Sequence, residues 1–301
     1  MHDNARAPAH YGSHTIPPNE LPWDEAIVRR ELQKTFASPS YRPPSLPEVA
    51  LKVMDLSRQP DVPISDLARV LEGDQLLAAR VLQLSQSSIY GRQPVQTLQQ
   101  AIMRLGVVVM RDVIFEASVT MRVFKAPNYV KTMTELRRHS VATAHFSRVV
   151  CRYTSMDAEY AFSCGLLHDV GIAASLVAVS DMPNAKDRAP LEEVWLAIRG
   201  IHEECSKYLA RLWGLPPDVQ FVLGAHHAFG NGAQVHPLAV VIALAEGIAV
   251  EHGLGVGMSL HMTEASDDLV VQRAAMVLKL SDKQLELIRA SCAKLLTEID
   301  L

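Results

Sequence analysis

Apolar residues recur every three or four positions along most of the chain, which is the spacing of amphipathic helices. Val28, Leu32 and Phe36 form one such stripe in the first segment after Trp23. No segment shows the sustained alternation of a half-buried strand, and no Asn-Gly hairpin signal occurs. The pattern therefore predicts an all-α fold.

Several segments are expected to be long helices. Residues 107–124 are apolar nearly all round, and their length favours a central helix over a strand. Residues 131–153, 157–179 and 236–252 are also read as helices, and two amphipathic segments follow a glycine-rich break after His252. We expect the ends to be set by four N-cap residues and three glycines: Ser65, Asp74, Thr97, Ser281 (in a capping box with Gln284), then Gly73 in a left-handed conformation, Gly106 and Gly214.

Composition narrows the function classes. The 29 Lys and Arg against 33 Asp and Glu give a net charge of -4, and only 6% of residues are aromatic. Neither property is typical of a nucleic-acid-binding protein, so a nucleic-acid partner is not expected. Residues 1–22 are proline-rich and poor in apolar side chains, which predicts a disordered tail.

Compartment signals favour a cytoplasmic protein without membrane contact. The four cysteines are widely spaced and form no C-x-x-C pair, which suits a reducing environment. The N-terminus lacks the apolar core of a signal peptide. The stretch from Pro237 to Val250 is broken by Glu246 and is too short to span a bilayer.

Five of the twelve histidines fall on predicted helices in the middle of the chain, one of them directly before an aspartate: His139, His168 with Asp169, His202, His226 and His227. Imidazole and carboxylate together suit Zn, Fe, Mn or Ni. Taken one at a time, each histidine fits a hydrogen-bonded or surface residue better. If they converge in the interior, their burial requires metal, water or partner groups. Gly165 and Gly171, on either side of the His-Asp pair, would let a neighbouring helix approach closely.

The motifs Arg138-His139-Ser140, GLLHDVG (165–171), HEECSKYLARLWGLP (202–216) and His226-His227 occur in order. Upstream stand LPEVALKVMDL (46–56), ISDLARVLEGDQLLAARVLQLSQSSIYG (64–91) and TLQQAIMRLG (97–106). The chain resembles the HDOD family, a signalling branch of the HD superfamily of metal-dependent phosphohydrolases. This resemblance implies an HD-type domain over 41–252 with helical lobes 41–125 and 126–252. An N-terminal helix and linker (23–40) precede it, and a helical C-terminal extension (253–301) follows.

The resemblance implies one or two divalent metal ions held by His139, His168, Asp169, His202, His226 and His227. Glu246 stands where the family pattern usually has Asp, and is taken as the last ligand. Asp169 is expected to bridge the ions and to be the catalytic residue if a reaction occurs. Arg137, Arg138, Lys207 and Arg211 either contact phosphate or lie on solvated helix faces.

Other positions depart from the enzymes of the superfamily. Ile172 stands where HD enzymes often carry a Lys, and the stretch after His227 lacks both the Glu and the Gly-Tyr-Pro of cyclic-di-GMP phosphodiesterases. Asp74-Gln75 and Gln86-Ser87-Ser88 replace the usual Asp-Pro and Asn-Ser-Ala. Cyclic-di-GMP hydrolysis is therefore not expected.

Two functions remain. The first is a bacterial regulatory module that acts by contact with a signalling protein and retains a metal site. The alternative is a metal-dependent phosphohydrolase for a nucleotide or another small phosphate-containing molecule. The sequence leans toward the first because the expected cation is missing at Ile172.

Overall fold

The computed structural model describes residues 25–299 except 47, 58, 60, 87–92, 155, 157–159, 183–189, 232–233 and 258–266. The tail expected over 1–22 lies outside these residues. The described chain is helical apart from one short antiparallel pair, β1 (Gly230–Asn231) and β2 (Gln234–Val235). The all-α prediction is confirmed.

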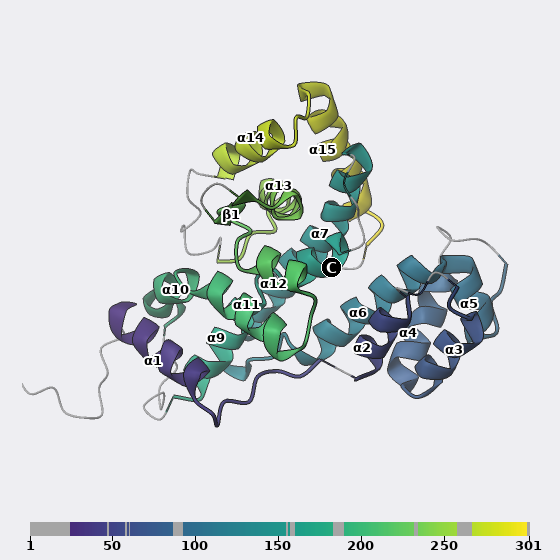
Figure 1. Cartoon of the computed structure of the whole chain (residues 1–301), viewed down its shortest axis with the longest axis horizontal. Coiled ribbons are helices and arrows are strands. Elements are labelled where there is room, and N and C mark those ends of the chain that lie inside the picture. The colour runs from purple at the N-terminus through teal and green to yellow at the C-terminus, as the bar shows by residue number, and fades with distance from the viewer. Residues whose placement is uncertain are drawn as a thin grey trace, which may run out of the picture.

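Five helices near the N-terminus share one hydrophobic core, on the right in Figure 1. They are α2 (Glu48–Ser57), α3 (Ile64–Glu72), α4 (Gln75–Ser85), α5 (Leu98–Leu105) and α6 (Val107–Arg122). Val53, Leu67, Leu77 and Ile102 are fully buried between them. Helix α6 continues past this core, and its Phe115 and Val119 join a second, larger one.

The second core is built around two helices that are apolar nearly all round, α9 (Val170–Ser180) and α13 (Pro237–Glu251). Around them lie η1 (Pro127–Tyr129), α7 (Val130–Tyr153), α8 (Ala161–Leu167), α10 (Leu191–Arg199), α11 (His202–Leu212) and α12 (Pro217–Leu223). The first helix, α1 (Glu25–Ala37), also packs here, with its stripe of Val28, Leu32 and Phe36 buried. It lies beside α10 rather than on the N-terminal helices (Figure 1).

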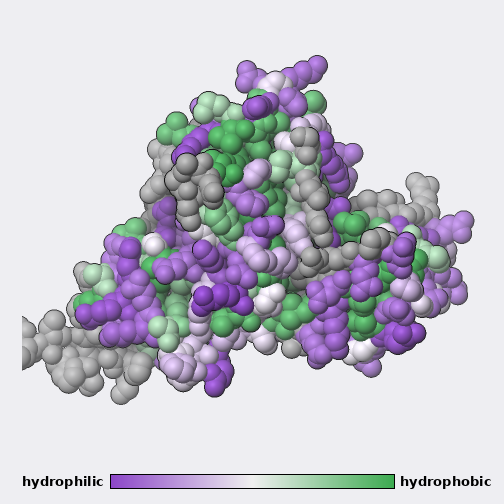
Figure 2. All heavy atoms as spheres, viewed as in Figure 1, coloured by the Kyte–Doolittle hydropathy of each residue, from purple (hydrophilic) through white to green (hydrophobic). Residues whose placement is uncertain are grey.

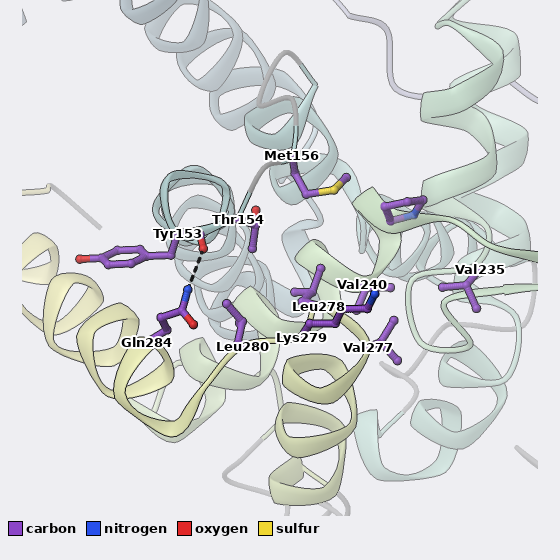
Figure 3. Close-up of a pocket in the computed structure, with 11 residues that line it drawn as sticks. Tyr153, Thr154, Met156, Val235, Val240, Val277, Leu278, Lys279, Leu280 and Gln284 are labelled. Atoms are coloured by element: carbon purple, nitrogen blue, oxygen red, sulfur yellow. Dashed lines mark hydrogen bonds between the residues drawn. The ribbon is translucent and has the colours of Figure 1, made fainter.

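The C-terminal extension forms α14 (Asp267–Val277) and α15 (Asp282–Leu296), which cover α13 and α7. Arg289 pairs with both carboxylate oxygens of Glu251. Gln284 donates to the carbonyl oxygen of Tyr153 at 3.4 Å. Both residues line a pocket together with Val240, Leu278 and Leu280 (Figure 3). The extension is therefore packed onto the second core.

Helix ends follow the predicted residues in most cases. Asp74, Thr97 and Ser281 accept backbone hydrogen bonds as N-caps, the last within a complete capping box. Gly106 and Gly214 have positive φ. Two expectations were wrong. Ser65 lies inside α3, whose preceding residue is Pro63, and Gly73 keeps a right-handed φ of -70° because the chain turns directly into the next N-cap, Asp74.

One stretch, Ala161–Ser180, is long and apolar enough to cross a membrane by length and composition. The chain turns at His168 and Asp169 in its middle, and 94% of its most apolar window is buried inside the protein. Both features fit a core segment of a folded domain.

Close helix packing at the two predicted glycines is confirmed. A Cβ on Gly171 of α9 would collide with the backbone of α11 at His202 and Ser206. A Cβ on Gly165 of α8 would lie 2.7 Å from the Cα of Ala144 and 2.8 Å from the carbonyl oxygen of Thr143, both in α7. Backbone atoms cannot rotate away as side-chain ends can, so these contacts require glycine.

We predict that Gly165→Ala lowers the free energy of unfolding by about 1–3 kcal/mol, because α8 must move off α7 to make room. Gly73→Ala is the control, since its Cβ would meet only the Val70 carbonyl at 3.3 Å, and it should cost under about 1 kcal/mol. Urea unfolding followed by circular dichroism measures both. Equal losses of unfolding free energy in the two variants would show that the close approach of α7 and α8 does not require glycine at position 165.

Candidate metal centre

His168 and Asp169 lie at a break between two helices. Helix α8 ends at Leu167 and α9 begins at Val170, so the two residues form the turn between them. The sequence pattern predicted one helix over 157–179, and this was wrong. The break matters because it directs Asp169 toward α11 while the apolar run continues on both sides.

The other candidate ligands come from four further parts of the chain. His139 is in the middle of α7, His202 is the first residue of α11 and Glu246 is in α13. His226 and His227 were expected at the C-terminus of a helix, but α12 ends at Leu223 and the two residues lie in the turn that follows. The structure brings all seven predicted site residues together. Four of them, His168, Asp169, His226 and His227, lie outside helices, and His202 stands at a helix start.

The carboxylate of Asp169 lies between two groups of histidines. Its Oδ2 is 3.7 Å from Nε2 of His139 and 3.4 Å from Nε2 of His168. Its Oδ1 is 3.4 Å from Nε2 of His202 and 3.5 Å from Nε2 of His226. Each oxygen therefore faces its own pair of imidazole nitrogens.

Two sets of ligand atoms, each within 4.8 Å of one another, share Asp169. The first set is His139, His168, Asp169 and Glu246; the second is Asp169, His202, His226 and His227. Such a division suits two cations joined by one bridging carboxylate. Whether the seven residues ligate metal stays a prediction.

Hydrogen bonds on the far side of the rings fix their tautomers. Four Nδ1 atoms lie near backbone carbonyl oxygens, which only accept: His139 to Leu254 at 2.9 Å, His168 to Gly165 at 2.8 Å, His202 to Arg199 at 2.6 Å and His226 to Leu223 at 3.2 Å. Each Nδ1 must therefore donate its hydrogen. In a neutral ring this leaves Nε2 with a lone pair directed into the site, as in metal-binding histidines.

With this tautomer, the short contact between His139 and His168 indicates whether a positive species is needed at the site. Their Nε2 atoms are 3.1 Å apart, and both carry lone pairs when the rings are neutral. Two lone pairs at that distance repel unless a positive species lies between or beside them. A shared proton would serve, but it requires an imidazolium in a fully buried position, so a divalent cation fits better.

Burial adds to this requirement. The side chains of His168 and His226 are fully buried, and that of Asp169 is 6% exposed. Among the described residues, Oδ1 of Asp169 and Nε2 of His226 have no hydrogen-bond partner. Each such group costs roughly 1–3 kcal/mol when left unsatisfied. The residues therefore fit a bound metal, which would satisfy both atoms.

Protonation states also suit metal binding. Burial lowers the pKa of His139 to about 4, and it lowers the pKa of His168, His202 and His226 as well. Burial alone would raise the pKa of Asp169, but the surrounding imidazoles, with His168 foremost, hold that pKa well below its ordinary value. Neutral rings and an ionised carboxylate are the forms that coordinate metals.

Sequence reasoning missed two residues that hold the site in place. Glu203 accepts a hydrogen bond from the backbone N–H of His227 at 3.0 Å, which ties the His-His turn to α11. Ser206 donates to the carbonyl oxygen of His168 at 2.7 Å and accepts from the N–H of Gly171 at 2.9 Å. Their one available signal was position, because both follow His202 on the same helix.

The site is open at one end. The side chain of His227 is 41% exposed, whereas those of His139, His168, Asp169, His202 and His226 are all at most 7% exposed. Ile172, which replaces the expected Lys, is 4% exposed in the core. Of the predicted phosphate contacts, Arg138 and Arg211 are exposed, Arg137 is partly exposed, and the Lys207 stem packs over Gly224.

The model of the HDOD domain matches residues 44–229, well over half of the chain. The chain belongs to the HDOD family. A curated relative from Treponema pallidum (strain Nichols), named only as an uncharacterized protein, is 23% identical over 232 residues. The alignment covers 72% of this HDOD chain but 45% of that relative, so the chain spans less than half its length.

Solved structures share the HDOD fold. An HDOD domain protein of unknown function from Geobacter sulfurreducens aligns with a TM-score of 0.65 at 22% identity, covering 91% of this chain and 96% of that one. A candidate metal-dependent phosphohydrolase from Shewanella amazonensis SB2B aligns with a TM-score of 0.65 at 18% identity, covering 89% of this chain and 99% of that one. A candidate signal transduction protein from Marinobacter aquaeolei VT8 aligns with a TM-score of 0.58 at 20% identity, covering 93% of this chain and 65% of that one.

Asp169→Ala is predicted to remove metal from both ligand sets, because it deletes the one carboxylate they share. When the variant is purified without chelator and analysed for transition metals, its metal content should be below about a tenth of that of the wild-type protein. Asp181→Ala is the matched control, an exposed aspartate at the end of the same helix, and should leave the content unchanged. Unchanged metal in Asp169→Ala would refute the assignment.

Metal-free protein should lose stability on mild acidification. The folded chain keeps His139 neutral down to a pKa of about 4, whereas the unfolded chain protonates it near 6.5. The unfolded state therefore binds more protons, and stability falls as pH drops from about 6.5 toward 4. Urea midpoints from pH 7 to 5 in chelator should show this.

His168→Asn should flatten that dependence, and His252→Gln, which changes an exposed histidine outside the site, should not. A midpoint independent of pH in the wild-type protein would contradict the buried neutral histidines.

Proposed function

We propose that this HDOD chain is a regulatory module of bacterial signal transduction that is centred on a divalent metal pair and acts through contact with another protein. The observation that carries the metal part is the arrangement at Asp169, where each carboxylate oxygen faces two imidazole Nε2 atoms at 3.4–3.7 Å. Ring tautomers set by backbone carbonyls support it further.

One cation would be held by His139, His168, Asp169 and Glu246, and the other by Asp169, His202, His226 and His227. Bound metals of this kind polarise phosphate oxygens and lower the pKa of a bound water. Ser206 and Glu203 hold the two turns that carry ligands in place through hydrogen bonds. Such a centre serves structure or sensing as readily as catalysis.

A regulatory role is favoured over catalysis by what surrounds the ligands. Ile172 is buried in the core, so no cation stands at the position where HD enzymes often steady a phosphate. Five of the seven candidate ligands are almost fully buried, which restricts a substrate to the His227 end. The basic side chains of Arg138 and Arg211 are solvent-exposed.

Protein contact is favoured by apolar residues on the C-terminal extension. Leu269 and Met276 are 66% and 72% exposed, and their spacing of seven residues places them on one face of α14. Hydrophobic atoms lie at the surface in this region of Figure 2. Large apolar side chains grouped on an exposed face are typical of interaction surfaces.

The second candidate is a metal-dependent phosphohydrolase, and one observation favours it. His227, a member of the second ligand set, is 41% exposed, so that half of the centre is accessible. A small phosphate ester could approach there, with Asp169 as the group nearest to both ligand sets.

Metal loading and hydrolysis separate the two candidates. Protein purified without chelator should carry one to two equivalents of transition metal, and its hydrolysis of nucleotides and p-nitrophenyl phosphate should not exceed that of Asp169→Ala. Less than about a tenth of an equivalent would overturn both candidates. Hydrolysis that Asp169→Ala abolishes would select the phosphohydrolase.

For the protein contact, a partner captured from native lysate by the wild-type chain should be lost with Leu269→Glu combined with Met276→Glu. The control is Met103→Glu, a residue 63% exposed on α5. Capture that survives the double substitution, or is lost equally with the control, would rule out the α14 face.

A further inference from the structure

A cavity of about 570 Å³ lies at the junction of the two lobes and the C-terminal extension. Its walls come from α4, α6, α7, α8 and the end of α15, so every major part of the fold contributes. None of the seven candidate metal ligands lines it. The volume is within the range of small-molecule sites.

Charged residues on α6 and α7 form a ladder along one wall. Arg148 donates to Oδ2 of Asp112 at 2.6 Å, and Nε2 of His145 is 3.3 Å from Oε2 of Glu116. The residue number rises along α7 from His145 to Arg148 while that of the partner falls along α6 from Glu116 to Asp112, so the two helices are antiparallel here. Asp112 is 3% exposed and also accepts from Arg111, which makes this a partly buried network.

The next step of the ladder is incomplete. Arg152 follows Arg148 by one turn of α7, and the same register places it opposite Val109 of α6, which carries no charge. In the described part of the chain Arg152 has no ion-pair partner. Arg80 of α4 lines the same cavity. The engagement of Arg148 with Asp112 uses one of its two terminal nitrogens.

The rest of the lining is mostly apolar. Phe162 of α8, which is 1% exposed, packs edge-on against the ring of His145 at 5.1 Å between centroids. Leu84, Val113, Val149, Leu295 and Ile299 complete the apolar surface. A ligand here would meet apolar walls, the arginines Arg80, Arg148 and Arg152, and the acidic side chains of Asp112, Glu116 and Glu298. Among these arginines, Arg152 forms no ion pair with the described residues.

We propose that this cavity binds a small amphipathic acid, with its carboxylate or phosphate against Arg152 and Arg148 and its apolar body against Phe162, Val113 and Leu295. The acid would supply the missing anionic partner in the α6–α7 ladder. The charge on Arg152 and the apolar lining select an acid with an apolar part over an inorganic anion or a neutral compound. This inference does not depend on the metal centre.

Four probes test the proposal on the full chain by isothermal titration calorimetry. Decanoate and AMP are the acids, and decanol and adenosine are their neutral counterparts. We expect at least one acid to bind at least about tenfold more tightly than its neutral counterpart, because a charge-assisted contact with Arg is lost in the latter. Binding of decanoate alone assigns a carboxylate ligand, and binding of AMP alone assigns a phosphate ligand.

Two variants locate the binding. Arg152→Gln removes a cation that forms no ion pair with the described residues, and should weaken binding of the acid about tenfold. Val109→Trp places a ring in the cavity and should abolish binding. Arg138→Gln is the matched control, an exposed arginine on the same helix outside the cavity, and should leave the affinity unchanged.

No binding of either acid up to about 1 mM would overturn the proposal. Equal affinity for acid and neutral probes would also overturn it. So would an affinity that both Arg152→Gln and Val109→Trp leave unchanged, because the probe would then lie elsewhere.

Discussion

A buried carboxylate among imidazoles is the constraint on which much of this structure depends. Asp169 can occupy the interior only if its charge is compensated. The fold brings four imidazole Nε2 atoms within 3.7 Å of its oxygens, and a cation held between these atoms would supply that compensation. To place it there, the apolar segment that runs from α8 to α9 turns at His168 and Asp169. Helix α11 must then approach so closely that only glycine fits at position 171.

The polar cluster is costly, and the surrounding core offsets that cost. Helices α9 and α13 are buried over almost their whole length, and apolar burial of this kind contributes about 25 cal/mol per Å². The ligand-bearing turns are also held by specific hydrogen bonds, one donated by Ser206 and one accepted by Glu203. The rings are therefore fixed in place before any cation arrives, which favours tight and selective binding.

The sequence predicted the helices and the identity of the clustered residues better than their local geometry. The stripe of Val28, Leu32 and Phe36 and the N-cap Asp74 depend on residues close together in the sequence. Such features could therefore be predicted from the sequence alone. The break at His168 was missed because apolar residues continue through it, and the interior packing overrides the periodicity there. Glu203 was missed because its contact with His227 joins residues 24 positions apart.

The geometry of the site predicts two cations, one on either side of the Asp169 carboxylate. Diffraction from crystals of protein purified without chelator, collected above and below a transition-metal absorption edge, tests this directly. We expect two anomalous peaks, one among His139, His168 and Glu246 and the other among His202, His226 and His227, with Asp169 between them. No peak in fully folded, metal-exposed protein, or a peak away from Asp169, would contradict it.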